Sequence, residues 1–106
     1  MAPVAYQVEL SPAAQRQLAK LPREEQARLA IAIRSFGEEP RPPGSKKLKG
    51  QANTYRLRVG KYRIIYDIYD QVLWVIILKV GHRKEVYQGE LIGKALRDLI
   101  ARKLLR

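Results

Sequence analysis

Residues 55–66 have the sequence YRLRVGKYRIIY, in which apolar residues alternate with basic ones on both sides of a central Gly-Lys pair. Alternation with a period of two is typical of β-strands, and glycine followed by a polar residue suits a two-residue turn. The stretch therefore predicts an antiparallel hairpin. In that hairpin Val59 pairs with Tyr62, so Arg58 lies directly opposite Arg63 on the same face.

The segments on either side of this hairpin predict helices first and a buried strand later. Ser11-Pro12 is a helix cap followed by a proline at the first helical position, and Gly37 suits the end of a later helix. A near-continuous apolar run indicates a strand inside the sheet. The expected elements are a strand at 5–10, a helix from 12 to about 21, a helix at 23–36, a loop at 38–45, an interior strand at 72–80 and a helix at 90–106.

Together these elements predict an α+β fold. We expect a small twisted antiparallel β-sheet with an N-terminal helical hairpin and a C-terminal helix. With 106 residues, 46% of them hydrophobic and 29% charged, the chain has the composition of a globular protein and enough material for one core. Residues 1–106 are therefore expected to form a single domain.

Several classes of protein are disfavoured by what the sequence lacks. It has no cysteine, which excludes disulfides, thiol nucleophiles and thiolate metal sites. The longest apolar run, residues 72–78, is too short to span a bilayer, and the first residues do not have the pattern of a signal peptide. We therefore expect a cytoplasmic protein.

The charge is strongly positive and unevenly distributed. Lysine and arginine number 21 against 10 acidic residues, which gives a net charge of +11. Residues 40–66, here called the basic band, contain no acid. A polyanion is the expected partner, with nucleic acid favoured over anionic lipid and an acidic protein as a further alternative. The basic residues of the band are Arg41, Lys46, Lys47, Lys49, Arg56, Arg58, Lys61 and Arg63.

The opposed pair of Arg58 and Arg63 is unfavourable for stability alone, because like charges across strands cost a few tenths to about 1 kcal/mol. One interpretation is that the guanidinium groups diverge into water or stack on nearby tyrosine rings. The other is an anion clamp, since the donors of arginine match the oxygens of a phosphate and its charge persists at any working pH.

The remaining polar residues disfavour a metal nuclease. His82 is the only histidine, which excludes chemistry based on two histidines, and the basic band offers no carboxylate ligands. This leaves metal-free phosphoryl chemistry, in which guanidinium groups stabilise the charge on phosphate and a tyrosine or histidine moves the proton. The carboxylates outside the band that could serve a metal are Asp67, Asp70, Glu85 and Glu90.

Three stretches together resemble the RelE toxins of the RelE/ParE superfamily: Lys49-Gly50, the hairpin at residues 55–66, and Val-Gly-His-Arg-Lys-Glu-Val-Tyr at residues 80–87. In weaker form the resemblance extends over residues 4–87. It implies the α+β fold described above and a toxin of a type II toxin–antitoxin system. It further implies cleavage of messenger RNA on the ribosome, an acidic antitoxin as partner, contacts with ribosomal RNA, and no cofactor or metal.

The resemblance also assigns roles to individual residues. Tyr87 corresponds to the catalytic tyrosine, which would accept the proton of a ribose 2′-hydroxyl as that hydroxyl attacks the adjacent phosphorus. A tyrosine has an ordinary pKa of about 10, so nearby cations are needed to favour its phenolate. The residues matched to the catalytic set are Arg56, Arg58, Arg63, Arg83 and Tyr87, with His82 as a second candidate for proton transfer. The residues expected to bind RNA are Lys46, Lys47, Lys49, Lys61 and Lys84.

The match departs from the family pattern in places. Well-studied members carry lysines where this chain has Arg56 and Arg58, and the change to arginine keeps the charge but removes any role as a proton donor. The segment from Arg83 to Tyr87 is shorter than in some members, which affects the reach of Tyr87. An alternative for Tyr87 is a buried aromatic at the end of a strand, and one for His82 is a partly exposed ring.

Two other functions remain open at this point. One is a ParE-like toxin that binds DNA gyrase and has no nuclease activity, and the other is a non-catalytic RNA-binding module. The expected helix at 90–106 is amphipathic, so it is either a permanent cover of the core or a lid that an antitoxin helix displaces. The codon preference, the identity of the antitoxin and the oligomeric state do not follow from the sequence.

Overall fold

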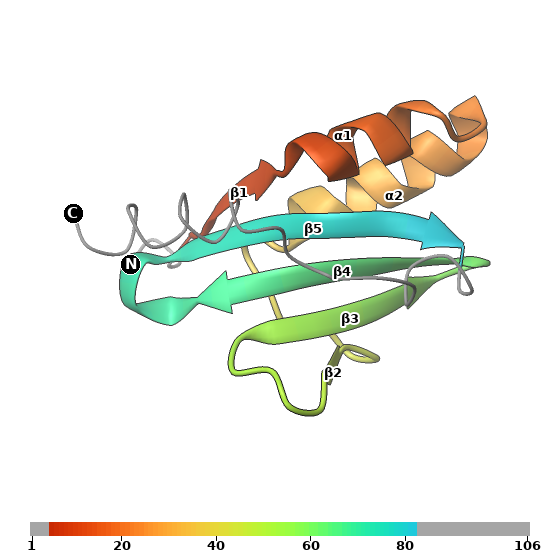
Figure 1. Ribbon diagram of the computed structural model, residues 1–106. Coiled ribbons are helices and arrows are strands. Elements are labelled where there is room, and N and C mark those ends of the chain that lie inside the picture. The colour runs from red at the N-terminus through yellow and green to blue at the C-terminus, as the bar shows by residue number, and fades with distance from the viewer. Residues whose placement is uncertain (1–4, 83–106) are drawn as a thin grey trace.

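The computed structural model describes residues 5–82, in which helices pack on one side of a sheet (Figure 1). Helix α1 spans Pro12–Ala19 and helix α2 spans Arg23–Ser35. The hydroxyl oxygen of Ser11 accepts a hydrogen bond from the Ala14 N–H at 3.0 Å and so caps α1. The predicted helical hairpin is confirmed. Helix α1 ends slightly earlier than expected because Pro22 disfavours a helical conformation at the residue before it.

The five strands form one sheet with the order β1-β5-β4-β3-β2. Strands β3 and β4 form the predicted hairpin, and the antiparallel β5 places β4 in the interior of the sheet. The bounds of the strands are β1 Gln7–Leu10, β2 Lys46–Lys47, β3 Thr54–Val59, β4 Tyr62–Tyr69 and β5 Trp74–His82.

The sheet is mixed, so the expectation of a purely antiparallel sheet was wrong for β1. This strand pairs in parallel with β5, from Gln7 opposite Trp74 to Leu10 opposite Ile77. A tight hairpin forces its two strands to be antiparallel, but β1 and β5 are connected through the rest of the fold. With so long a connection, tertiary packing determines the relative direction of β1 and β5. A local sequence pattern does not encode that packing.

The last strand also begins later than the predicted residue 72. Asp70–Val72 forms a short 3-10 helix, η1, and Leu73 follows with a left-handed φ of 51°. These residues make the turn from β4 to β5, so the strand begins only at Trp74. The apolar run therefore contributes part of its length to a turn.

Two apolar clusters lie on opposite faces of the sheet. On the face covered by the helices, Leu29, Ile33 and Phe36 of the α2 region pack against β4 and β5. The opposite face, here called the far face, carries a second cluster. Both interior strands are thus buried on both sides, as the apolar run predicted. The second cluster consists of Ile65, Tyr69, Trp74, Ile76 and Leu78, with Leu48 packed against it.

The expected helix at 90–106 lies outside the described residues. Within residues 5–82, neither helix has the length and apolar character needed to cross a bilayer.

Candidate functional site

The β3–β4 hairpin has the predicted register. Its two-residue turn is Gly60-Lys61, and Gly60 has a left-handed φ of 62°, which glycine adopts without strain. Val59 pairs with Tyr62, and Arg58 pairs with Arg63. Since directly paired residues have Cβ atoms about 4.5–5.5 Å apart, the two arginines begin side by side on the far face.

A second row of basic residues crosses the sheet next to this pair. Arg56 on β3 lies opposite Lys46 on β2 and opposite Ile65 on β4. Ile65 in turn lies opposite Lys79 on β5. Because Ile65 belongs to the far-face cluster, its paired neighbours project from that face too. We call the five cations of these two rows the basic ladder: Lys46, Arg56, Arg58, Arg63 and Lys79.

The arginines of the ladder differ in burial. Arg58 is exposed and Arg56 is half-buried, whereas only 8% of Arg63 is exposed. Its register partner on β5 is Gly81, which adds no side chain above the pair. A buried guanidinium is held in place by its surroundings, so Arg63 is the most firmly positioned arginine of the ladder.

Lys79 was not predicted as a site residue. Strict alternation from Val75 and Ile77, which face the helices, would put Lys79 on the helix side as well. A register shift between Ile65 and Tyr66 inserts an extra residue in β5 and turns Lys79 to the far face. A lysine inside an apolar strand is the one signal in the sequence that could have identified it.

The acids on the far face are already engaged in hydrogen bonds. Asp67 is 1% exposed and accepts hydrogen bonds from the hydroxyl groups of Thr54 at 2.6 Å and Tyr69 at 2.7 Å. Burial, followed by the bond to Asp67, raises the pKa of Tyr69 above its ordinary value. Glu9, on β1, accepts a hydrogen bond from the indole N–H of Trp74. These carboxylates therefore hold neighbouring side chains of the far face in place.

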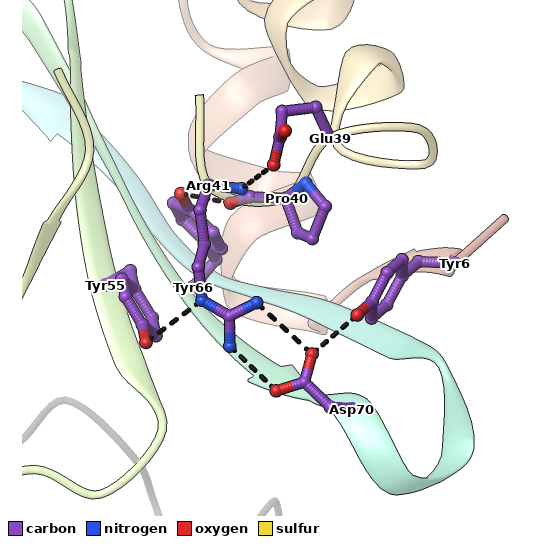
Figure 2. A network of polar contacts seen from close by, with 7 residues as sticks. All are labelled: Tyr6, Glu39, Pro40, Arg41, Tyr55, Tyr66 and Asp70. Carbon is purple, nitrogen blue, oxygen red and sulfur yellow. Dashed lines mark hydrogen bonds and ion pairs between the residues drawn. The ribbon is translucent and has the colours of Figure 1, made fainter. Parts of the chain in front are cut away.

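Arg41 belongs to the basic band in sequence but to a different site in space. Its Nη1 and Nη2 atoms lie 3.2 and 2.8 Å from the two carboxylate oxygens of Asp70, as Figure 2 shows. Its Nε donates to the Tyr55 hydroxyl at 3.2 Å, and its guanidinium lies 5.1 Å from the centre of the Tyr55 ring. Tyr6 donates to Asp70 at 2.5 Å. Arg41 thus ties together the loop after α2, β3 and η1 rather than adding to the ladder.

The same loop is held by a second contact. The hydroxyl of Tyr66 donates to the carbonyl of Pro40 at 2.7 Å, and burial raises the pKa of Tyr66 to about 12. The Tyr66 ring stacks on Phe36 with ring centres 4.1 Å apart. The loop that carries Pro40 and Arg41 is therefore fixed to the sheet at two points (Figure 2).

We expect Asp70→Asn to lower the free energy of unfolding by up to about 1 kcal/mol at neutral pH, because the ion pair with Arg41 is partly exposed. The bonds from Arg41 and Tyr6 lower the pKa of Asp70. Its contribution is therefore present above the unfolded pKa of about 3.9 and lost as the pH falls through the folded value. Denaturant titrations of both proteins across that range test this.

A matched control is Glu25→Gln, because Glu25 makes only a loose pair with Arg28 at 3.9 Å. Its effect should be smaller than that of Asp70→Asn at neutral pH. A deficit of Asp70→Asn that stayed constant into strong acid would contradict the role given to the ionised carboxylate.

His82 lies at the end of β5 and is exposed. It pairs with Tyr62, which packs against the cluster under the helices, so the His82 side chain starts from the helix side of the sheet. The ring centres of Tyr62 and His82 are 6.3 Å apart with an edge-to-face angle of 83°. The His82 side chain therefore starts from the side of the sheet opposite to that of the Arg58–Arg63 pair.

The other predicted lysines lie around the edges of the sheet and are exposed. Lys47 pairs with Tyr55 and so starts from the opposite side of the sheet to the ladder. Lys49 lies in the β2–β3 loop, and Lys61 lies in the hairpin turn. Arg83, Lys84 and Tyr87 lie outside the described residues. In the part of the chain from 5 to 82, no group of three or more acidic or histidine side chains is placed to hold a metal ion.

The chain matches known toxins over most of its length. A family model described as the ParE toxin of the type II toxin–antitoxin system parDE matches residues 8–87. Toxin RelG of Mycobacterium tuberculosis is 36% identical over 84 residues, which are 78% of this chain and 97% of that protein. The match thus includes both the described hairpin and the segment that follows β5.

Solved structures of similar proteins have the same fold. The crystal structure of the toxin–antitoxin complex RelBE2 from Mycobacterium tuberculosis matches with a TM-score of 0.66 and 36% identity, covering 76% of this chain and 93% of that chain. The archaeal RelE–RelB complex from Pyrococcus horikoshii matches with a TM-score of 0.68 and 28% identity, covering 74% and 96%.

Proposed function

Because this chain belongs to the family of ParE toxins of type II toxin–antitoxin systems, as a RelE-like toxin of the RelE/ParE superfamily, we propose that it is a ribosome-dependent endoribonuclease that cleaves messenger RNA and thereby inhibits translation. The observation that carries the proposal is the pair of Arg58 and Arg63 in the basic ladder. Adjacent guanidinium groups repel each other, and a bound phosphate removes that repulsion while accepting their hydrogen bonds.

The proposed reaction needs no metal or cofactor. The 2′-hydroxyl of a ribose attacks the adjacent phosphorus and forms a new O–P bond, while the bond from phosphorus to the 5′ oxygen of the next nucleotide breaks. A base removes the proton of the 2′-hydroxyl, and the departing 5′ oxygen takes up a proton. The products are a 2′,3′-cyclic phosphate and a free 5′-hydroxyl.

Different residues of the chain would carry out the different parts of this reaction. Arg63, buried and held in place, would bind the phosphate oxygens and stabilise the extra negative charge of the transition state. Arg83 would stabilise the same charge near the leaving oxygen. Tyr87 would act as the base, and the cations Arg56 and Arg58 would favour its phenolate form. The ribosome would supply the geometry of the substrate.

The exposed lysines would bind the RNA backbone around this centre. Phosphate contacts of this kind give affinity without sequence preference and weaken as salt rises. The set proposed for this role is Lys46, Lys47, Lys49, Lys61 and Lys84.

An antitoxin is the second partner we propose. The related solved structures include the toxin–antitoxin complex RelBE2 from Mycobacterium tuberculosis and the RelE–RelB complex from Pyrococcus horikoshii. A net charge of +11 and the basic ladder favour an acidic segment that covers the ladder and blocks RNA. With these partners, the proposed site of action is the cytoplasm.

A ParE-like toxin that binds gyrase without cutting RNA is the second candidate, since the matching family model is named for ParE. Such a toxin needs a docking surface but no cluster of cations around a scissile phosphate. The basic ladder therefore favours the nuclease. A non-catalytic RNA-binding module would retain the ladder and lack turnover.

The deciding experiment is to add the purified protein to a reconstituted translation system and map the ends of the messenger. The proposal expects cuts in the messenger that require ribosomes and carry 2′,3′-cyclic phosphate ends, including when magnesium is kept at the level that ribosomes need and no other metal is added. A parallel supercoiling assay with purified gyrase tests the rival. Intact messenger together with inhibited gyrase would replace the nuclease with the ParE-like function.

A further inference from the structure

A pocket lies at the end of the sheet beside the turn between α1 and α2. In Figure 1 this turn, the end of β5 and the β3–β4 hairpin all lie at the right-hand side. The pocket has a volume of about 520 Å³ and is lined by Gln17, Lys20, Leu21, Pro22, Tyr62 and His82, together with residues 80–81 of β5. Volumes of about 300–1,000 Å³ are usual for small-molecule sites, so one planar ring system fits inside.

The walls of this pocket suit a planar aromatic ligand. Tyr62 and His82 offer two rings at 83° to each other, so a ligand lying flat on one meets the edge of the other. Leu21 and Pro22 add apolar surface. The carbonyl oxygen of the Gln17 side chain accepts the Val80 N–H at 2.8 Å, which fixes the polar group of Gln17 at the pocket wall.

A second, smaller hollow adjoins the first. It has a volume of about 280 Å³ and is lined by Arg58, Gly60, Lys61 and His82. His82 lines both, so an aromatic pocket and a cationic one share this residue. Arg58 also belongs to the basic ladder, which connects the cationic hollow to the proposed cleavage site.

An aromatic pocket beside a cationic hollow matches the two halves of a nucleotide. We propose that these two pockets form a nucleotide subsite next to the cleavage site, with an unpaired RNA base against Tyr62 and His82 and its phosphate between Arg58 and Lys61. Single-stranded RNA is recognised in general by stacking of splayed bases on aromatic rings together with contacts to phosphate. This inference rests on the proposed function, and it makes His82 a positioning residue rather than the base of the reaction.

The test uses direct binding, without ribosomes or cleavage. Two short single-stranded oligoribonucleotides with 2′-O-methyl riboses are compared on the full chain by fluorescence anisotropy, one complete and one with a single abasic position. We expect the complete oligonucleotide to bind about tenfold more tightly, the scale of one base stacked on an aromatic side chain. Equal affinity for the two would overturn the proposal.

Variants separate stacking from charge and from proton transfer. His82→Ala should remove most of the difference between the two oligonucleotides, and His82→Phe should retain it, because phenylalanine stacks but carries no proton. Lys61→Ala should weaken both oligonucleotides by the same factor and reduce the salt dependence. If His82→Phe behaved like His82→Ala in binding, stacking by this residue would be refuted.

The outcome is independent of the proposed nuclease activity. Preference for the base-containing oligonucleotide in a protein that leaves the messenger uncut would support the subsite and refute the nuclease. Ribosome-dependent cleavage by a protein with no preference for the base-containing oligonucleotide would support the nuclease and refute the subsite. In the cleavage assay the subsite predicts that His82→Ala lowers kcat/KM more than His82→Phe does, whereas a base at His82 predicts the same large fall in kcat for both variants.

Discussion

Arg63→Ala should lower ribosome-dependent cleavage by on the order of a hundredfold or more, since removing one preorganised donor to a developing charge costs about 2.7–4 kcal/mol. Arg63 is suited to that role because it is 8% exposed and lies opposite Arg58 on the face of the basic ladder. Single-turnover cleavage in a reconstituted translation system measures the effect. The same expectation holds for Arg83→Ala.

Truncation of a buried side chain can also weaken the fold, so further variants are needed as controls. Arg63→Met keeps most of the volume without the charge, and Arg63→Lys keeps the charge without the forked donors. Arg34→Ala on α2 removes an exposed arginine on another element and should leave cleavage near the wild-type level. Near-wild-type cleavage by Arg63→Ala and Arg63→Met, with unchanged melting temperatures, would remove Arg63 from the mechanism.

Arg58→Ala provides a finer comparison. Arg58 is exposed, so its guanidinium is positioned less firmly and its loss should cost less than that of Arg63. Removing one member of the pair also relieves the repulsion between them, so Arg58→Ala should not lower stability. Burial, which the alternating sequence does not encode, therefore distinguishes two arginines that the sequence presents as equivalent.

The register of this site was predictable because a two-residue turn fixes the pairing of every residue in a hairpin. The sequence of residues 58–63 contains both the turn and the arginines, so the pairing of Arg58 with Arg63 follows from local information alone. The helical hairpin was predictable for the same reason, since Ser11, Pro12 and Pro22 mark the ends of the helices locally.

What the sequence did not reveal depends on contacts between distant segments. Lys79 reaches the ladder only through a register shift between β4 and β5. Arg41 lies apart from the basic ladder because Asp70, 29 residues away, binds its guanidinium. The parallel pairing of β1 with β5 likewise joins segments more than 60 residues apart. Counting charges along the chain therefore groups Arg41 with the basic residues of the site, where it does not lie, and leaves out Lys79, which does lie there.

In the proposed reaction the cations of the site favour a tyrosine as the base. A phenolate is an anion, so nearby cations lower the cost of forming it. His82 in addition starts from the helix side of the sheet, opposite Tyr62. We therefore propose Tyr87 rather than His82 as the residue that takes up the proton.

Tyr87→Phe should therefore keep ribosome binding and lose most of the turnover. The change removes one hydroxyl group, and a positioned acid or base typically contributes about 10²–10⁴-fold to the rate. Sedimentation with ribosomes measures binding, and single-turnover cleavage measures the chemical step. His82→Phe is the matched comparison, because it also leaves an aromatic ring without a transferable proton and should cost far less turnover than Tyr87→Phe. Cleavage that survives Tyr87→Phe but is abolished by both His82→Phe and His82→Ala would transfer the role of base to His82.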